Sequence, residues 1–252
     1  MKYLFSLLLI VLFSSGFRTQ INQVDAQGRK QGVWKKTYPN SSVLMYHGSF
    51  VDNKPTGLFI YYNKNRTKKA LMNHNHLTGR SVVNFFHSNG QLMSVGIYNN
   101  QKKDSIWREF NIDGKLIEIS KYNKGKLDGL KQLYYVTGEL AQYKSLLHSI
   151  KTFSGGMANG QYFEYFMDGS IKIKGHYLND NKDGLWQIYN EKGIIVISER
   201  YKNKKKHGWC VYLNENDDTK LKQYFFEGEL LKGKERLNKL NELKEKGINP
   251  ND

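Results

Sequence analysis

The feature that most constrains the fold of this sequence is an internal repeat of about 24 residues. Similar segments open with a glycine, or once with a serine, at Gly32, Gly57, Gly79, Ser105, Gly129, Gly160, Gly184 and Gly208. The successive spacings are 25, 22, 26, 24, 31, 24 and 24 residues. A unit of this length cannot bury an apolar face alone, so neighbouring units must stack to form a core. The sequence therefore predicts eight stacked units.

Each unit has the pattern of a β-hairpin. A second glycine follows the opener by nine positions at Gly114, Gly138, Gly169 and Gly193, and by eleven at Gly90. Aromatic and β-branched residues, which favour strands, lie between the two glycines. The second glycine suits the left-handed position of a short hairpin turn. Sixteen strands spaced by about 4.8 Å predict a ribbon on the order of 75 Å long.

The returning strand of each hairpin shows a period of two. An aliphatic residue such as Ile195 lies two positions after the second glycine, and a tyrosine usually lies eight positions after it. These tyrosines are Tyr98, Tyr122, Tyr177 and Tyr201. Because both offsets are even, we expect Ile195 and Tyr201 to share one buried face.

A second aromatic series lies two positions after the openers. It comprises Trp34, Phe59, Trp107, Tyr162 and Trp186. Core packing is the expected role of these rings. The alternative is a row of platforms on which sugars stack, as in hairpin repeats that bind choline or glucan.

The first residues differ from the repeats and have the pattern of a signal peptide. Residues 1–16 contain Lys2, an apolar run over residues 3–13, and small residues before a cut after Gly16. The run is about half the roughly 20 residues of a spanning helix. We therefore expect an exported chain, in the periplasm, at the cell surface or outside the cell, with no transmembrane anchor after processing. The single cysteine, Cys210, excludes a disulfide framework.

The remainder divides into repeats over residues 17–228 and a different C-terminal segment over residues 229–252. Residues 234–246 favour a helix, with Gly247 as a stop, and this helix can cap the last strand. The spacing between Gly129 and Gly160 exceeds the common one by seven residues. We expect that excess to form a protruding loop within residues 149–156.

The segments from Lys182 to Gly193 and from Asp25 to Trp34 resemble the variant MORN repeats of bacterial YwqK-type proteins. The resemblance covers roughly residues 25–228. It implies an all-β fold of tandem β-hairpins stacked into an elongated, twisted antiparallel sheet with a C-terminal capping helix. MORN-repeat proteins are mostly scaffolds for protein partners, and some contact phospholipids. The antitoxin label attached to this family would imply a cytoplasmic partner, which disagrees with the predicted signal peptide.

The sequence contains no nucleophile elbow, metalloprotease, phosphate-loop or dinucleotide motif. His74, His76 and His87 are a weak metal candidate, and solvated turns are the favoured interpretation. His207 and Cys210 are three positions apart, which places them on opposite faces of a strand and disfavours a Cys–His nucleophile. We therefore predict a protein that is not an enzyme, with no catalytic, metal or cofactor residues, and we rank a hydrolase third.

The charge balance points to a binding role. Thirty-nine basic and 23 acidic side chains give a net charge of +16. The densest basic cluster lies in one expected turn, at Lys202, Lys204, Lys205 and Lys206. We predict an exported scaffold that binds a protein partner through a basic sheet surface, with envelope glycan or anionic lipid as the alternative partner. Export argues against nucleic acid.

Overall fold

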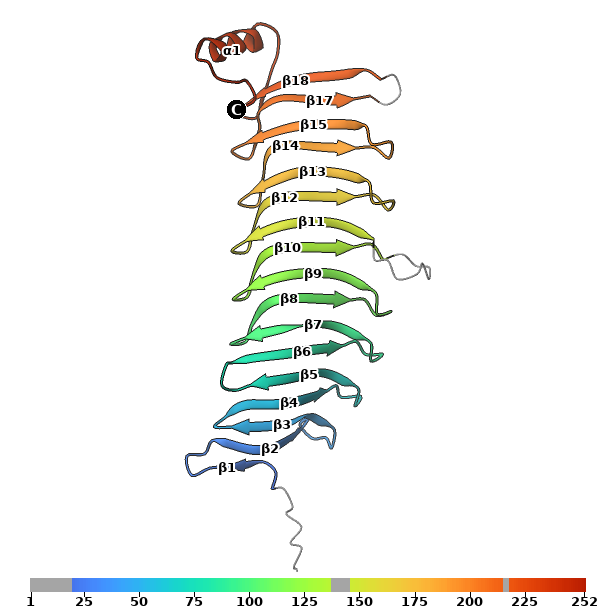
Figure 1. Cartoon of the computed structure of the whole chain (residues 1–252), viewed down its shortest axis with the longest axis vertical. Coiled ribbons are helices and arrows are strands. Elements are labelled where there is room, and N and C mark those ends of the chain that lie inside the picture. The colour runs from blue at the N-terminus through green and yellow to red at the C-terminus, as the bar shows by residue number, and fades with distance from the viewer. Residues whose placement is uncertain (1–19, 137–145, 215–217) are drawn as a thin grey trace, which may run out of the picture.

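The computed structural model describes residues 20–136, 146–214 and 218–252. It confirms the predicted all-β class: the described chain forms one antiparallel sheet of 19 strands with a helix at its C-terminal end (Figure 1). The strands are β1 Gln23–Val24, β2 Lys30–Thr37, β3 Leu44–Val51, β4 Lys54–Tyr62, β5 Lys68–Asn75, β6 Arg80–Phe86, β7 Leu92–Asn99, β8 Lys102–Phe110, β9 Leu116–Asn123, β10 Lys126–Tyr134, β11 Leu147–Ser154, β12 Met157–Tyr165, β13 Ile171–Leu178, β14 Asn181–Tyr189, β15 Ile195–Lys202, β16 Lys205–Lys206, β17 Gly208–Leu213, β18 Lys220–Phe226 and β19 Glu229–Leu231. The helix is α1 Gly233–Glu245.

Strand pairing follows the order of the chain. Each strand pairs with the next one, except that β16 and β17 both pair with β15. Most turns along one edge of the sheet contain two residues with positive φ, such as Asn203 and Lys204 at 49° and 71°. This geometry matches the twist of the flanking strands, so successive hairpins add to the same sheet.

The strand register corrects the position of the third unit. Gly57, Ser105 and Gly184 lie opposite the ring residues His74, Tyr122 and Tyr201. In the third hairpin the residue with this pairing is Ser81, opposite Tyr98. Gly79 lies two residues earlier, in a turn where its N–H donates to the carbonyl of Asn75. With Ser81 as the opener, the spacings become 25, 24, 24, 24, 31, 24 and 24 residues.

A β-bulge in the returning strand overturns one expectation about the core. Ile195 lies opposite Tyr189, but Ile197 lies opposite Ile188, so β15 contains one residue more than β14 at this point. Side chains alternate between the two faces of a strand, and one extra residue shifts this alternation. Residues an even number of positions apart then lie on opposite faces when the bulge stands between them. Ile195 is 40% exposed. The prediction that Ile195 shares a buried face with Tyr201 is therefore wrong.

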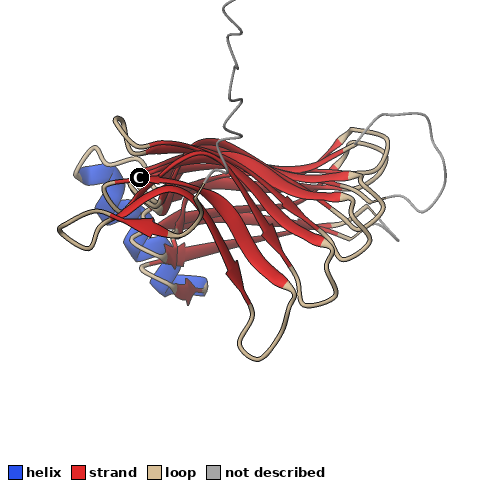
Figure 2. Ribbon diagram, turned by 90° about the horizontal axis from the view of Figure 1, so that it is seen from below, coloured by secondary structure: helices blue, strands red, loops and turns tan. Residues whose placement is uncertain are grey.

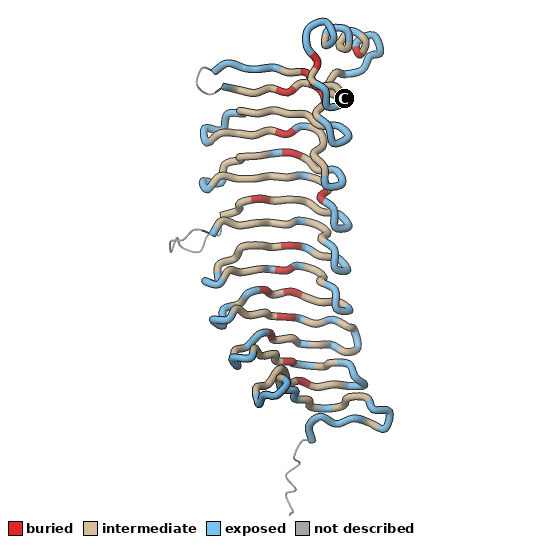
Figure 3. The backbone as a smooth tube through the Cα atoms, turned by 180° about the vertical axis from the view of Figure 1, so that it is seen from behind, coloured by how far each residue is buried: buried red, intermediate tan, exposed pale blue. Residues whose placement is uncertain are grey.

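The sheet is a single twisted and curved layer along most of its length (Figure 2). We call one side the aromatic face, which carries Phe59, Trp107 and Trp186, and the other the helix face, against which α1 packs at Trp209. Few residues are fully buried, and they lie mainly along the middle of the strands (Figure 3). Because most of the sheet is a single layer, a side chain is buried chiefly by neighbouring side chains on the same face of the sheet.

Other sequence predictions concern the two ends of the chain and the long interval between Gly129 and Gly160. The prediction of a protruding loop at residues 149–156 is wrong, because these residues form most of β11 and the two-residue turn that follows it. The additional residues of this unit fall between β10 and β11. Gly138 and the predicted signal peptide lie outside the described residues. Gly247 has φ of 66°, and its N–H donates to the carbonyl of Lys244 just after α1. That is the geometry of a helix stop.

Candidate functional site

The rings of the aromatic face lie over glycines of the preceding strand. A Cβ added to Gly96 or Gly175 would overlap the indole of Trp107 or Trp186. A bulge at the opener Gly184 lets the ring of Trp186 lie over Gly175. Between Lys174 and His176 on β13, the partner residues on β14 advance by four positions instead of two. The indole N–H of Trp186 donates to the carbonyl of His176 at 3.0 Å.

The role of these glycines was not predicted from the sequence. Each lies eleven residues before its ring, at Gly48 before Phe59, Gly96 before Trp107 and Gly175 before Trp186. The sequence pattern that could have identified them is a glycine two positions before the aromatic residue of the returning strand, as Gly96 stands before Tyr98 and Gly175 before Tyr177.

Lysines cover the same rings. The ammonium of Lys103 lies 4.3 Å from the ring centre of Trp107 and 4.9 Å from that of Tyr122. The ammonium of Lys182 likewise lies 4.5 Å from the ring centre of Trp186 and 5.2 Å from that of Tyr201. Trp107 is 1% exposed and Trp186 is 4% exposed. These rings pack as a core, and neither offers an open face on which a sugar could stack.

Carboxylates compensate several lysines on the aromatic face. Glu199 accepts hydrogen bonds from Lys206 at 2.6 Å, from the hydroxyl of Tyr201 at 2.7 Å and from that of Tyr212 at 2.9 Å. Burial by itself would raise the pKa of Glu199, but these hydrogen bonds outweigh burial and hold it below its usual value. Lys131 pairs with Glu118 in the same way at 2.9 Å.

The four lysines predicted to bind a partner do not share one environment. Lys202, Lys204 and Lys205 are exposed around the turn between β15 and β16. Lys206 instead forms the ion pair with Glu199. The hydrogen bond to Glu199 raises the pKa of Lys206 above its usual value, against the opposing effect of burial. Lys206 is therefore part of the packing between hairpins.

The helix face carries a column of exposed aliphatic side chains, and it was not recognised from the sequence. The column residues directly follow the opener positions and are exposed by 37 to 55%: Leu58, Val82, Ile106, Leu130 and Leu185. Strand pairing places Ile97 beside Val82, Lys121 beside Ile106 and Arg200 beside Leu185. Asp104 lies opposite Ile97 on the same face. The face is thus aliphatic with interspersed charged residues of both signs.

The C-terminal member of this column is Trp209, and α1 covers it. Trp209 packs against a buried cluster of Tyr224, Leu231 and Leu243, to which α1 contributes Leu243. The backbone N–H of Trp209 also donates to the side chain of Asn251 at 3.1 Å. The helix lies at the end of the sheet (Figure 1). Over β4 to β14, none of the described elements covers the column.

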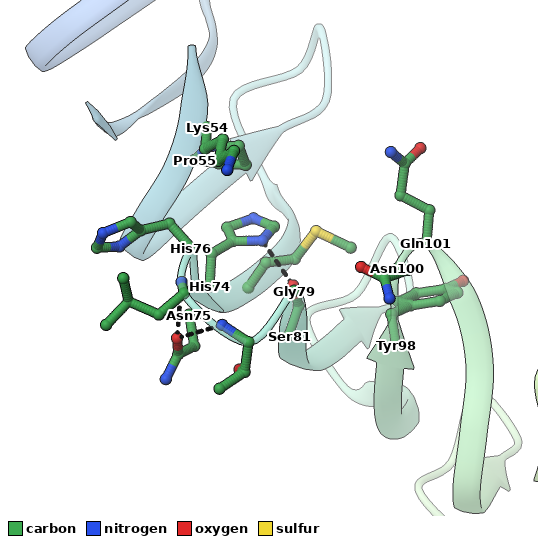
Figure 4. A pocket seen from close by; sticks show the side chains of 13 residues that line it. Lys54, Pro55, His74, Asn75, His76, Gly79, Ser81, Tyr98, Asn100 and Gln101 are labelled. Atoms are coloured by element: carbon green, nitrogen blue, oxygen red, sulfur yellow. Dashed lines mark hydrogen bonds between the residues drawn. The ribbon is translucent and has the colours of Figure 1, made fainter. Parts of the chain in front are cut away.

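The third hairpin contains a hollow of about 860 Å³ (Figure 4). His74 lines it, and its Nδ1 lies 2.7 Å from the hydroxyl of Ser81. Burial lowers the pKa of His74, so the imidazole is neutral at pH 7. Tyr98 and the turn residues Asn100 and Gln101 form another wall.

His74 and His76 both line the hollow, whereas His87, His207 and Cys210 are not among its lining residues. Nε2 of His87 donates to the carbonyl of Phe110 at 2.9 Å, and Nδ1 of His76 lies 2.9 Å from the hydroxyl of Thr56. Burial raises the pKa of the Cys210 thiol and lowers that of His207. Within the described ranges, no group of three His, Cys, Asp or Glu residues could hold a metal ion.

The same described part of the chain contains no helix long and apolar enough to cross a membrane.

Comparisons with known proteins identify no family. No family model and no curated protein matches the chain. Among solved structures, a S. aureus TarM variant in complex with fondaparinux, alpha-GlcNAc-glycerol and UDP matches with a TM-score of 0.22 and 15% identity, over 46% of this chain and 19% of that one. A TcdB2-TccC3 structure matches with a TM-score of 0.21 and 16% identity, over 79% of this chain and 11% of that one. These TM-scores are too low to support an inference.

Proposed function

We propose that this chain is an exported, non-enzymatic repeat scaffold of the MORN type that binds a partner protein through its helix face. The observation that carries the proposal is the aliphatic column, in which Leu58, Val82, Ile106 and Leu130 are each about half exposed. Exposed apolar side chains gathered on one face mark interaction sites on proteins. Asn73 lies between Leu58 and Val82, so a partner would contact separate aliphatic side chains along this face. Its period of 24 residues along the chain gives a partner the same contact on successive hairpins.

The charges on this face define the chemistry of the partner. Lys121 lies beside Ile106, and Arg108 lies opposite Ile119 on the same face. Asp104 and Asp183 lie on this face too, opposite Ile97 and His176. On the aromatic face, glutamates compensate several of the lysines. A partner surface with apolar side chains and interspersed carboxylates would match the helix face. Charge would speed association, and apolar contact would supply affinity.

The test is capture from an envelope extract with the immobilised chain. A helix-face variant replaces Leu58, Ile106 and Leu130 with serine. These side chains are exposed, so their replacement should leave the free energy of unfolding nearly unchanged. The binding protein is identified by mass spectrometry, and its affinity for each variant is then measured with the purified partner.

A matched control replaces Ile112, Met167 and Ile194 with serine. These residues are 51, 60 and 47% exposed but lie in turns at the edge of the sheet. We expect the control to bind the partner like the wild type and the helix-face variant to lose at least tenfold in affinity. Equal binding by both variants contradicts the proposal. Retention only by anionic vesicles or envelope glycan would favour the alternative partner class.

A further inference from the structure

The third hairpin breaks the repeat at neighbouring positions, and the hollow lies there. β5 and β6 pair without a register shift, so this hairpin lacks the bulge that follows the opener elsewhere. Gly79 is two residues before the opener Ser81, where Lys103 and Lys182 stand in other hairpins. In those hairpins the lysine side chain covers the rings. The third hairpin has neither the bulge nor the lysine, and this leaves the hollow.

The hollow has the size and mixed lining of a small-molecule site. Its volume of about 860 Å³ is within the range of ligand pockets. Pro55, Met72, Leu77 and Tyr98 supply apolar surface. Figure 4 shows Lys54 on one side of the hollow, and Asn100 and Gln101 of the β7–β8 turn on another.

The polar groups of the hollow favour an anion. No Asp or Glu is among its lining residues. The side chains of Lys54, Asn100 and Gln101 are exposed, and none of the ion pairs among the described residues involves Lys54. An ammonium and two amide groups can together bind a carboxylate or phosphate through charge-assisted hydrogen bonds.

We propose that the hollow binds a small organic anion, a carboxylate or phosphate attached to an apolar body. Lys54 pairs with the charge, Asn100 and Gln101 donate to the anion, and Tyr98 and Leu77 contact the body. The site is on the aromatic face, so it is independent of the partner surface on the helix face.

The experiment titrates the full chain with benzoate, phenyl phosphate and uncharged benzyl alcohol by isothermal calorimetry. Benzoate and phenyl phosphate separate a carboxylate from a phosphate preference, and benzyl alcohol supplies the same body without charge. Lys54→Gln removes the ammonium. Lys126→Gln is the matched control, because Lys126 is also the first residue after a two-residue turn but is not among the residues that line this hollow.

We expect at least one anion to bind saturably at millimolar concentrations and benzyl alcohol to bind at least fivefold more weakly. Lys54→Gln should weaken binding of that anion at least fivefold, and Lys126→Gln should leave it unchanged. Gln101→Ala should weaken it as well. The proposal is overturned if neither anion binds, if the alcohol binds as well as the anions, or if Lys54→Gln and Lys126→Gln have the same affinity.

Discussion

Gly175 on β13 allows a quantitative test of how rings pack on the aromatic face. Its backbone is extended, with no positive φ, so alanine is acceptable to the backbone itself. An alanine in a strand gains about 0.5–1 kcal/mol over glycine because the unfolded chain has less freedom to lose. The added Cβ overlaps the indole of Trp186, however, and overpacking costs about 1–3 kcal/mol. We expect Gly175→Ala to lower the free energy of unfolding by about 1–2 kcal/mol.

The ring contact can be isolated by repeating the change in a Trp186→Ala background. Without the indole, Gly175→Ala should raise the free energy of unfolding by about 0.5–1 kcal/mol, so the sign reverses. Urea denaturation followed by circular dichroism measures all four proteins, and hydrogen exchange locates the change on β13 and β14. Equal destabilisation in both backgrounds would refute the packing of Trp186 over Gly175.

Three further predictions concern the backbone, an ion pair and pH. Ser105 holds φ of 61°, so Ser105→Gly should raise the free energy of unfolding by about 1 kcal/mol in urea denaturation; a loss would contradict the strained geometry. Lys206→Gln should cost about 1–2 kcal/mol in the same assay and Lys204→Gln under about 0.5, and equal effects would contradict the role of the Glu199 ion pair. Burial lowers the pKa of His74 and His207 below 6.5, so the unfolded chain binds protons first and stability should fall as pH drops through 6.5. If the urea concentration at the unfolding midpoint does not decrease as the pH is lowered from about 7.5 to about 5, the result would contradict this burial.

The hairpins could be predicted from sequence because turn chemistry is local. Glycines such as Gly114 and Gly193 adopt positive φ, as a short turn requires. The register could not be predicted, because it depends on how two strands pair. Gly79 matched the glycine pattern, but pairing places Ser81 in the opener position. Ile195 would share the face of Tyr201 only in an unbroken pleat, and the bulge beside Ile195 interrupts the pleat.

The candidate surfaces were harder to anticipate for the same reason. Lys103 and Lys182 look like solvated charges in the sequence, and only the strand pairing brings them over tryptophans. Leu58 and Ile106 look like ordinary strand residues until the fold shows that most of the sheet has a single layer. The hollow depends on a missing side chain at Gly79, which no local pattern reveals.

Small-angle X-ray scattering with inline mass measurement tests the central claim most directly, which is that the helix face stays open in solution. About 17 full strand spacings make a sheet on the order of 80 Å long. For the full 252-residue chain we expect a monomer of 29.4 kDa with a radius of gyration of about 25 Å, well above the ~18 Å of a compact chain of this length. A compact particle, or a dimer that covers the helix face, would contradict it.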